Sequence, residues 1–499
     1  MNLLLLGLAA TLSASSAPSD DTNAAYRELA SKDPHHPRYH FAPSAFWIND
    51  PNGFVKHDGV YHLFYQLSTR PEGPDSVKHW GHATSRDLVH WQEAPIALSP
   101  GPDGGDSVGC WSGSILRHDG RFMAFYTGVM PEEAQCLAVS EDSQLLDWEK
   151  DPGNPIIAVH ASGLPLISFR DPTLWRDGDH WMMGVGTGVR GKGGGVLSYR
   201  SSDLRNWEYA GPLYVDEANE YSYLFECPSF HSLGDKHLLL YSAHYHNDPI
   251  SSCYFLGQYA DGRFTPDTYA RLDLSSDYYA AQAYPVDGRL LAFAWVKSGR
   301  EQETWPQFGW SGAISFPREL SLGDDGALVI RPPRELDALR GKHHAFAAAK
   351  LTPNSTGACP GLLSDACEIQ ATFAPDDDGA FAAERFGLVL RQSPDGEEQT
   401  RICYEPGTKR LVMERAKSSL NEKVLKDTQQ GDLVLAQGEA LRLRVFLDQS
   451  IIEIYANDRV AGTLRVYPTR EDSLGVDAFV EGGDVQLTQL EAWEFGSSS

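Results

Sequence analysis

The sequence predicts an all-β protein in which a five-bladed β-propeller is followed by a β-sandwich. Two patterns favour this fold: a strand-like motif that recurs five times at nearly even spacing, and a change to strict two-residue alternation near residue 340. The length agrees with it, because 499 residues exceed what one hydrophobic core normally supports. We therefore expect a propeller domain over residues 35–340 and a sandwich domain over residues 345–496.

The N-terminal segment has the composition of a secretion signal. Residues 3–12 read LLLLGLAATL and are followed by SASSA, an apolar run and small-residue site typical of a cleaved signal peptide. No Lys or Arg precedes the run, and it is too short to span a bilayer. We expect residues 1–17 to be the signal peptide of a secreted, extracellular protein; a frayed apolar N-terminus is the alternative.

An apolar strand that begins just after a glycine recurs through the first domain. The five copies read GVYHLFYQ, GRFMAFYTG, GDHWMMGVG, GDKHLLLYSA and GRLLAFAW, and they begin at Gly59, Gly120, Gly178, Gly234 and Gly288. Their separations are 61, 58, 56 and 54 residues. Such a period of short strands is typical of propeller blades, each of which is a small antiparallel sheet. A β-sandwich with irregular hairpins is the alternative, but it does not require even spacing.

The second domain lacks this motif and alternates strictly instead. The segments EALRLRVFLD (439–448) and SIIEIYAND (450–458) place apolar residues at every second position. Because successive side chains of a strand point to opposite faces, this pattern gives each sheet one apolar face. Two such sheets packed together make a sandwich.

Charge and cysteine content narrow the possible partners. The net charge of −26 would repel nucleic acid and anionic membranes, so we expect neither as a partner and favour a neutral solute.

The seven cysteines show no CxxC pair, which argues against a structural zinc site. Cys359 and Cys367 can close a small disulfide loop in an exported protein. Residues 354–356 read Asn-Ser-Thr, which is an acceptor pattern for glycosylation.

Three acids occupy equivalent positions in the repeat. Asp50 lies nine residues before the first marker glycine, Asp171 seven before the third and Glu226 eight before the fourth; Ser112 lies eight before the second. Because the first strand of each propeller blade lines the central channel, these side chains should converge. Carboxyl groups held close together cannot all ionise freely, so such a cluster indicates a functional site. A plain turn at Pro51-Asn52-Gly53 is the alternative reading for Asp50.

Glycosidic bond cleavage needs this pair of groups: one carboxylate to attack the anomeric carbon and one protonated carboxyl to protonate the leaving oxygen. Glu226 is the better acid, because its apolar neighbours favour the neutral form. Asp50 lies between amide side chains that can keep it ionised. We expect Asp171 to be an anion held by Arg170, and a structural ion pair is the alternative for these two residues.

These segments resemble glycoside hydrolase family 32, the invertases and fructan hydrolases. The resemblance rests on WINDPNG (47–53), FRDP (169–172) and FECP (225–228), which stand in the family's order. HWGHATSRDLVHW (79–91), WSGS (111–114) and DQSIIEIYANDRVAGTLRVYP (448–468) extend it over nearly the whole chain. The resemblance implies a five-bladed propeller joined to a sandwich, and hydrolysis with retention through a covalent fructosyl intermediate.

Carried onto matching positions, the resemblance implies Asp50 as nucleophile, Glu226 as acid/base and Asp171 as stabiliser of the transition state. It also implies a fructosyl subsite lined by Trp47, Asn49, Gln66, Trp111, Ser112 and Arg170. It implies neither a metal nor an organic cofactor.

We therefore predict a secreted β-fructofuranosidase whose partners are small carbohydrates: sucrose, fructo-oligosaccharides and the terminal fructosyl units of fructans. A fructosyltransferase with the same three acids is one alternative. A carbohydrate-binding propeller without turnover is another, although binding alone does not need an acid together with a nucleophile. The sequence predicts no particular oligomeric state.

Overall fold

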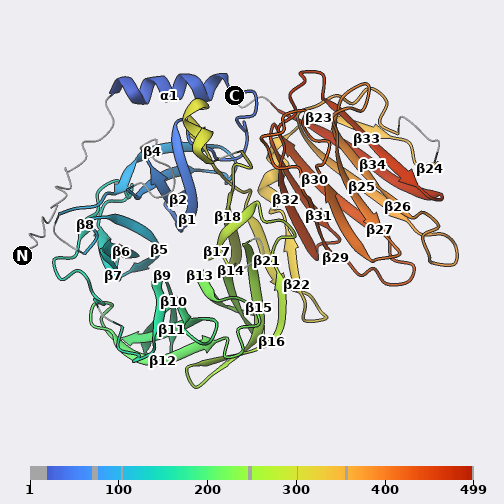
Figure 1. Ribbon diagram of the computed structural model, residues 1–499. Coiled ribbons are helices and arrows are strands. Elements are labelled where there is room, and N and C mark those ends of the chain that lie inside the picture. Colours follow the sequence, from blue (N-terminus) through green and yellow to red (C-terminus); the bar gives the residue numbers. More distant parts are fainter. Residues whose placement is uncertain are drawn as a thin grey trace, which may run out of the picture.

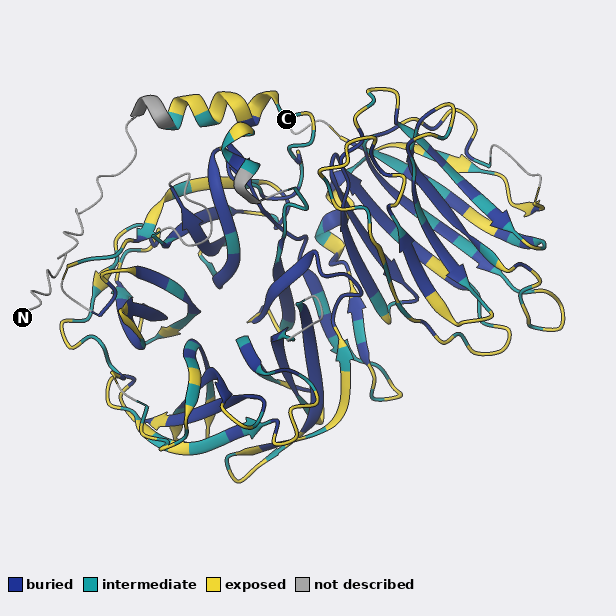
Figure 2. Cartoon of the chain, in the orientation of Figure 1, coloured by how far each residue is buried: buried dark blue, intermediate teal, exposed yellow. Residues whose placement is uncertain are grey.

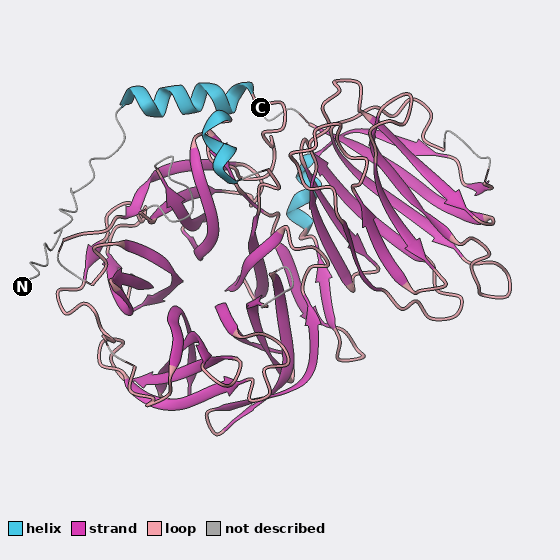
Figure 3. Ribbon diagram, in the orientation of Figure 1, coloured by secondary structure: helices cyan, strands magenta, loops and turns pink. Residues whose placement is uncertain are grey.

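The computed structural model describes residues 20–69, 77–102, 105–158, 160–245, 250–300, 302–353 and 358–496. The chain is mostly β (Figure 3), as the alternating and repeated patterns predict. The expected signal peptide (1–17) and the glycosylation pattern (354–356) lie outside the described residues. Within the described ranges, no helix is long and apolar enough to cross a membrane.

Five antiparallel sheets follow one another along residues 46–331, which we call the N-terminal lobe, and they surround a central region (Figure 1). The first strand of each sheet contacts the first strand of the next, and β17 contacts β1, so these inner strands form a closed ring. The strands are β1 (Phe46–His57), β2 (Val60–Ser68), β3 (His79–Ser85) and β4 (Trp91–Leu98); β5 (Gly109–His118), β6 (Arg121–Met130), β7 (Glu132–Ser140) and β8 (Glu149–Lys150); β9 (Leu166–Asp177), β10 (His180–Val189), β11 (Gly194–Ser201) and β12 (Glu208–Val215); β13 (Leu224–Leu233), β14 (Lys236–His244), β15 (Ser251–Ala260) and β16 (Arg263–Arg271); β17 (Tyr278–Val286), β18 (Arg289–Val296), β21 (Arg318–Leu322) and β22 (Leu328–Arg331).

The five marker glycines all lie in the turn between the first and second strands of a sheet, as the repeat predicts. Each has a positive φ, from 56° at Gly178 to 80° at Gly120. In the pairs Asp58-Gly59 and Asp119-Gly120 both residues have positive φ, which is the conformation of the tight hairpin turns that match strand twist. A fixed turn therefore sets the distance from each glycine back to the inner strand.

The ring is closed by a short segment that joins the last sheet to the first. β19 (Trp310–Ser311) pairs in parallel with β1, and β20 (Ala313–Ile314) pairs with β18. Gly312 lies between them at φ 79°, and a Cβ there would be 2.2 Å from the Ile48 carbonyl oxygen. Only glycine fits this close approach.

One helix lies outside the sheets, against the closing segment. α1 (Asp20–Lys32) packs its Tyr26 ring on Phe46 and on Trp305, with centroid distances of 5.9 and 5.6 Å. Trp305 belongs to the short 3-10 helix η2 (Gln302–Gln307). The helix thus covers the start of β1.

Two further sheets form the C-terminal lobe, residues 340–495, after the 3-10 helix η3 (Arg334–Leu339). Apolar residues of both sheets share one core. In Figure 2 the strands of this lobe are mostly buried and the loops that connect them are mostly exposed. The larger sheet contains β23 (Arg340–Phe346), β24 (Ala349–Leu351), β25 (Ala366–Ala374), β30 (Leu441–Asp448), β31 (Ile451–Ala456), β32 (Val460–Arg465) and β34 (Val485–Phe495). The smaller contains β26 (Arg385–Gln392), β27 (Thr400–Glu405), β28 (Arg410–Glu414), β29 (Thr428–Asp432) and β33 (Gly475–Glu481).

Buried charges join the two lobes. His40, which precedes β1, lies between Asp448 and Glu453 of the C-terminal lobe, 2.9 and 3.1 Å from their carboxylate oxygens. Arg415 of the C-terminal lobe pairs with Asp277 of the N-terminal lobe, and all of these side chains are fully buried. Buried charges of this kind persist only when each is paired, so the pairs fix how the lobes dock.

Cys359 and Cys367 are buried thiols, so the disulfide loop that these two residues could close is absent. Both of these side chains belong to the apolar core of the C-terminal lobe, where a thiol packs as a small hydrophobic group.

Candidate active site

Each inner strand carries an irregularity of pairing at the same level. The pairing register shifts between Ile48 and Gly53 in β1, Cys110 and Gly113 in β5, Arg170 and Thr173 in β9, Glu226 and Ser229 in β13, and Tyr279 and Gln282 in β17. Asp171, Cys227 and Ala280 lie in these breaks with φ of 63°, 49° and 53°. A β-bulge bends its strand and redirects a side chain. The five bulges place the predicted site residues on one ring of bent backbone.

Asp50 is held by three neighbours from three strands. One carboxylate oxygen accepts hydrogen bonds from the Ser112 hydroxyl at 2.7 Å and the Cys227 thiol at 3.5 Å. The other accepts from the Asn49 side-chain amide at 2.9 Å. The aspartate is 9% exposed, so it is an oriented, nearly buried group and not a surface turn residue.

Asp171 is held by one hydrogen bond from its own backbone and by another to its carboxylate. Its own N–H donates to the Thr127 hydroxyl at 2.8 Å, and its carboxylate accepts the N–H of Cys227 at 2.9 Å. Cys227 therefore contacts Asp50 through its thiol and Asp171 through its backbone. The two aspartates flank the same residue of β13, next to Glu226.

Glu226 is bound at both carboxylate oxygens. Arg170 lies 2.8 Å from Oε1, and His244 lies 2.9 Å from Oε2. The Tyr279 hydroxyl donates to Oε2 as well and lies 2.8 Å from the same His244 nitrogen. Arg170 is closer to Glu226 than to Asp171, which lies 3.7 Å from its Nε.

This geometry reverses the expected order of acidity. Burial raises the pKa of Asp50 and of Asp171, and the charge of Glu226 raises both further. Burial also opposes ionisation of Glu226, but Arg170 and the bonds from His244 and Tyr279 prevail and lower its pKa. These shifts run opposite to the expected ones, in which the neighbours of Glu226 raise its pKa and those of Asp50 lower the pKa of the aspartate. The Arg170 guanidinium lies 2.8 Å from Glu226, and together with His244 and Tyr279 it has a larger effect on the pKa of this carboxyl than its apolar surroundings have.

The predicted subsite residues lie around the acids. Trp47 packs on Trp295 with 5.8 Å between ring centroids, and Gln66 donates to the Cys110 carbonyl at 3.1 Å. Arg170 lies over the Trp111 ring at 5.6 Å, and Asn49 accepts from Lys78 at 3.3 Å. Asn49, Ser112 and Arg170 thus contact the acids directly. Trp111 contacts Arg170, whereas Trp47 and Gln66 contact other residues of the inner and second strands.

Two residues that bond Glu226, His244 and Tyr279, were not predicted as site residues. Tyr279 lies nine residues before Gly288, so the same count that identified Asp50 in the first repeat finds it in the fifth. His244 ends the second strand of its sheet, and only the pairing of β14 with β13 brings it beside Glu226. No pattern in the sequence marks it.

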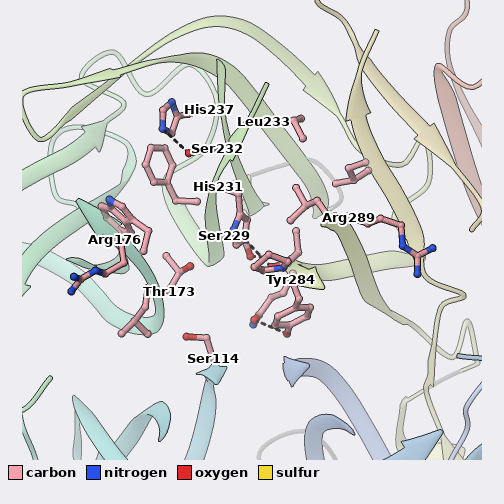
Figure 4. Close-up of a pocket in the computed structure, with 18 of the residues that line it drawn as sticks. Ser114, Thr173, Arg176, Ser229, His231, Ser232, Leu233, His237, Tyr284 and Arg289 are labelled. Carbon is pink, nitrogen blue, oxygen red and sulfur yellow. Dashed lines mark hydrogen bonds between the residues drawn. The ribbon is translucent and has the colours of Figure 1, made fainter. Parts of the chain in front are cut away.

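A cavity of about 960 Å³ lies on the same inner strands but does not contain the acids. It is lined by Ser114, Thr173 and Ser229, which come two or three residues after Ser112, Asp171 and Glu226 (Figure 4). The acids therefore lie at one level of the ring, and this cavity at the next level. Among the described residues, no group of three or more His, Cys, Asp or Glu side chains is arranged to hold a metal ion.

Comparisons with family models and with known proteins cover nearly the whole chain. Residues 40–332 match "Glycosyl hydrolases family 32 N-terminal domain", and residues 335–494 match "Glycosyl hydrolases family 32 C terminal". The chain is 33% identical to a sucrose-6-phosphate hydrolase of Escherichia coli, over 92% of this chain and 95% of that protein. It is 32% identical to a raffinose invertase of the same organism, over 92% and 94%.

A solved structure is similar across both lobes. The fructan 1-exohydrolase IIa of Cichorium intybus in complex with 1-kestose superimposes with a TM-score of 0.81 and 26% identity, over 93% of this chain and 98% of that one. Since the matches to the family together cover nearly the whole chain, the protein belongs to glycoside hydrolase family 32 and is a glycoside hydrolase.

Proposed function

We propose that the protein is a retaining β-fructofuranosidase that hydrolyses sucrose and the terminal fructosyl units of fructans. The observation that carries the proposal is that Asp50 and Asp171 both bond to Cys227, the residue that follows Glu226. Glycoside hydrolysis uses two carboxyl groups on either side of the scissile bond, and retention needs them close together. The names of the relatives, which include an invertase and a fructan exohydrolase, support the fructosyl group as the part of the substrate that is recognised.

The proposed architecture is a five-bladed propeller over residues 35–340 and a sandwich over residues 345–496. The five sheets would be the blades, and their inner strands would present the acids around one sugar. The N-terminal sequence supports export of the protein with residues 1–17 removed.

In the proposed reaction, the Asp50 carboxylate attacks C2 of the fructosyl group, and the bond from C2 to the glucosyl oxygen breaks. Glu226 gives a proton to that oxygen, so glucose leaves neutral. Water then attacks C2 of the fructosyl-enzyme, its proton passes to Glu226, and fructose is released with Asp50 again free. The three bonds that hold Asp50 fix the direction of its attack.

Asp171 would bind the fructosyl hydroxyl groups. Asp171 bonds to the N–H of Cys227, which places it close to both reacting carboxyls. Burial raises its pKa, and hydrogen bonds from the sugar hydroxyls would stabilise its ionised form. Bonds of this kind strengthen as charge develops on the sugar ring.

The test is release of fructose from sucrose by purified protein, compared with Asp50→Asn. Loss of the nucleophile should lower kcat by about three orders of magnitude or more. Asp261→Asn is the matched control, because Asp261 is exposed in a turn at φ 51° that Asn also adopts. Equal rates for the wild type and Asp50→Asn would reject the assignment.

Product analysis separates the alternatives. Glucose and fructose in equal amounts at high sucrose indicate a hydrolase, and dominant trisaccharide indicates a fructosyltransferase. Sucrose 6-phosphate, inulin and levan should be compared with sucrose in the same assay, because the relatives' names divide among these substrates. Tight binding of sucrose without product would identify a binding protein.

A further inference from the structure

His244 and Glu226 face each other through atoms that can share a proton. Nε2 of His244 lies 2.9 Å from Oε2 of Glu226, and the Tyr279 hydroxyl lies against both. An imidazole nitrogen donates when it carries a proton and accepts when it does not. When Nδ1 of the ring carries a proton, the contact can be satisfied in two ways: a carboxylic acid that donates to bare Nε2, or a carboxylate that accepts from protonated Nε2. Both contain the same number of protons.

The surroundings of Glu226 favour its carboxylate form. Arg170 is 2.8 Å from Oε1, and it also lies 3.7 Å from both Asp171 and Glu133. Burial opposes ionisation of Glu226, but the Arg170 guanidinium and the bonds from His244 and Tyr279 outweigh it and lower the pKa, so the carboxyl loses its proton early. A general acid, however, must hold a proton when the substrate binds.

We propose that His244 is a positioning residue that stores the proton of Glu226, so that the two side chains act as one acid/base pair. This inference rests on the proposed fructosyl hydrolase. In the first step the proton of the ring passes to the Glu226 carboxylate as Glu226 protonates the leaving oxygen, and the ring becomes neutral. In the second step the proton that water loses returns through Glu226 to the ring. Proton and charge are thus balanced over the cycle.

The remaining charged and titratable groups do not replace the imidazole. Glu226 pairs with Arg170, and burial together with the Glu226 charge raises the pKa of Asp50 and of Asp171. His244 faces the ring of Tyr223 at 5.8 Å and the ring of Tyr279 at 6.1 Å. Burial and the Glu226 charge raise the pKa of Tyr279, so its hydroxyl remains a donor throughout the working range.

The test is the pH profile of His244→Gln with sucrose, because Gln keeps a hydrogen-bonding amide but cannot store a proton. We expect the basic limb of kcat/KM to move down by about one pH unit or more. We expect kcat at pH 7 to fall about tenfold or more, with KM within about threefold of the wild type. His237→Gln is the control: His237 lies on the same strand, bonds Ser232 at 3.2 Å and lines the separate cavity of Figure 4. Its profile should match the wild type.

A substrate that needs no acid separates proton storage from damage to the site. β-Fructofuranosyl fluoride loses fluoride without protonation, so His244→Gln should keep kcat/KM for it within about threefold of the wild type. An unshifted basic limb in His244→Gln, or an equal loss with the fluoride, would overturn the inference; His244→Asn gives the same reading if the Gln variant does not fold. Failure of the wild type to release fructose would instead overturn the proposed function.

Discussion

His40 is the residue whose replacement tests how the lobes are held together. It is 4% exposed and stacks on Phe316 with 3.7 Å between ring centroids, while its two nitrogens reach Asp448 and Glu453. The perturbation is His40→Gln, which keeps a polar side chain but removes the cation between two buried carboxylates.

The structure sets the size of the effect. Removing one partner from a buried ion pair costs about 3–5 kcal/mol. Asp448 keeps three backbone N–H donors and Glu453 keeps one, from Phe316, which offset part of that loss. We therefore expect His40→Gln to lower the free energy of unfolding by about 3 kcal/mol near pH 5.5, the lower end of the range.

The effect should depend on pH with a definite sign. Burial opposes protonation of His40, but the two carboxylates outweigh it and raise its pKa, so its stabilisation is complete below the ordinary imidazole pKa of about 6.5 and is lost as pH rises through the folded value. Asp448 and Glu453 have lowered pKa values despite burial, because His40 bonds to both and Arg318 adds its charge at Glu453, so their contribution is lost only on acidification. The window of full stabilisation is about pH 4.5 to 6.5.

Urea denaturation followed by tryptophan fluorescence at pH 5.5 and pH 9 measures this difference. The stability lost in His40→Gln should be smaller at pH 9, by about 1.4 kcal/mol for each unit by which folding raises the His40 pKa. An equal loss at both pH values, or no loss at either, would refute the account of His40 as a buried cation.

Two other predictions concern the segment that closes the ring and the state of the cysteines. Gly312→Ala should lower the free energy of unfolding by about 2 kcal/mol or more in the same assay, because its Cβ would meet the Ile48 carbonyl at 2.2 Å at a positive φ. Gly407→Ala, whose Cβ meets nothing within 4 Å, should have little effect; equal losses would show that the closing segment is not tight. A reducing agent should leave Tm unchanged, because none of the seven cysteines, all of which the structure describes, forms a disulfide; a fall in Tm would reveal one.

The repeat predicted the position of the acids because a hairpin turn has a fixed length. Asp50, Asp171 and Glu226 lie nine, seven and eight residues before their glycines, and the small variation reflects the bulges that each inner strand contains. Local sequence thus places a residue on its strand and at its level. The same count from the marker glycine places Tyr279 at this level in the fifth repeat, although it is not an acid.

Protonation could not be predicted in the same way. It depends on which carboxylate Arg170 faces, and that choice is a side-chain orientation across two sheets. It also depends on His244, which is next to Glu226 in space but 18 residues later in the chain. The closing strands β19 and β20 were missed because two-residue strands are too short to show a period. Helix α1 was not predicted either.

The closing segment has a consequence for biogenesis. β1 bears Asp50 and is the first strand to leave the ribosome, yet β19, which pairs with the edge of β1 opposite β2, is translated only after three more complete sheets and the first two strands of the fifth. Until then a nascent chain exposes an unpaired strand edge, which is the kind of surface that invites aggregation. Enzyme activity should accordingly be the last property acquired during synthesis, and chains truncated before Trp310 should depend most on chaperones.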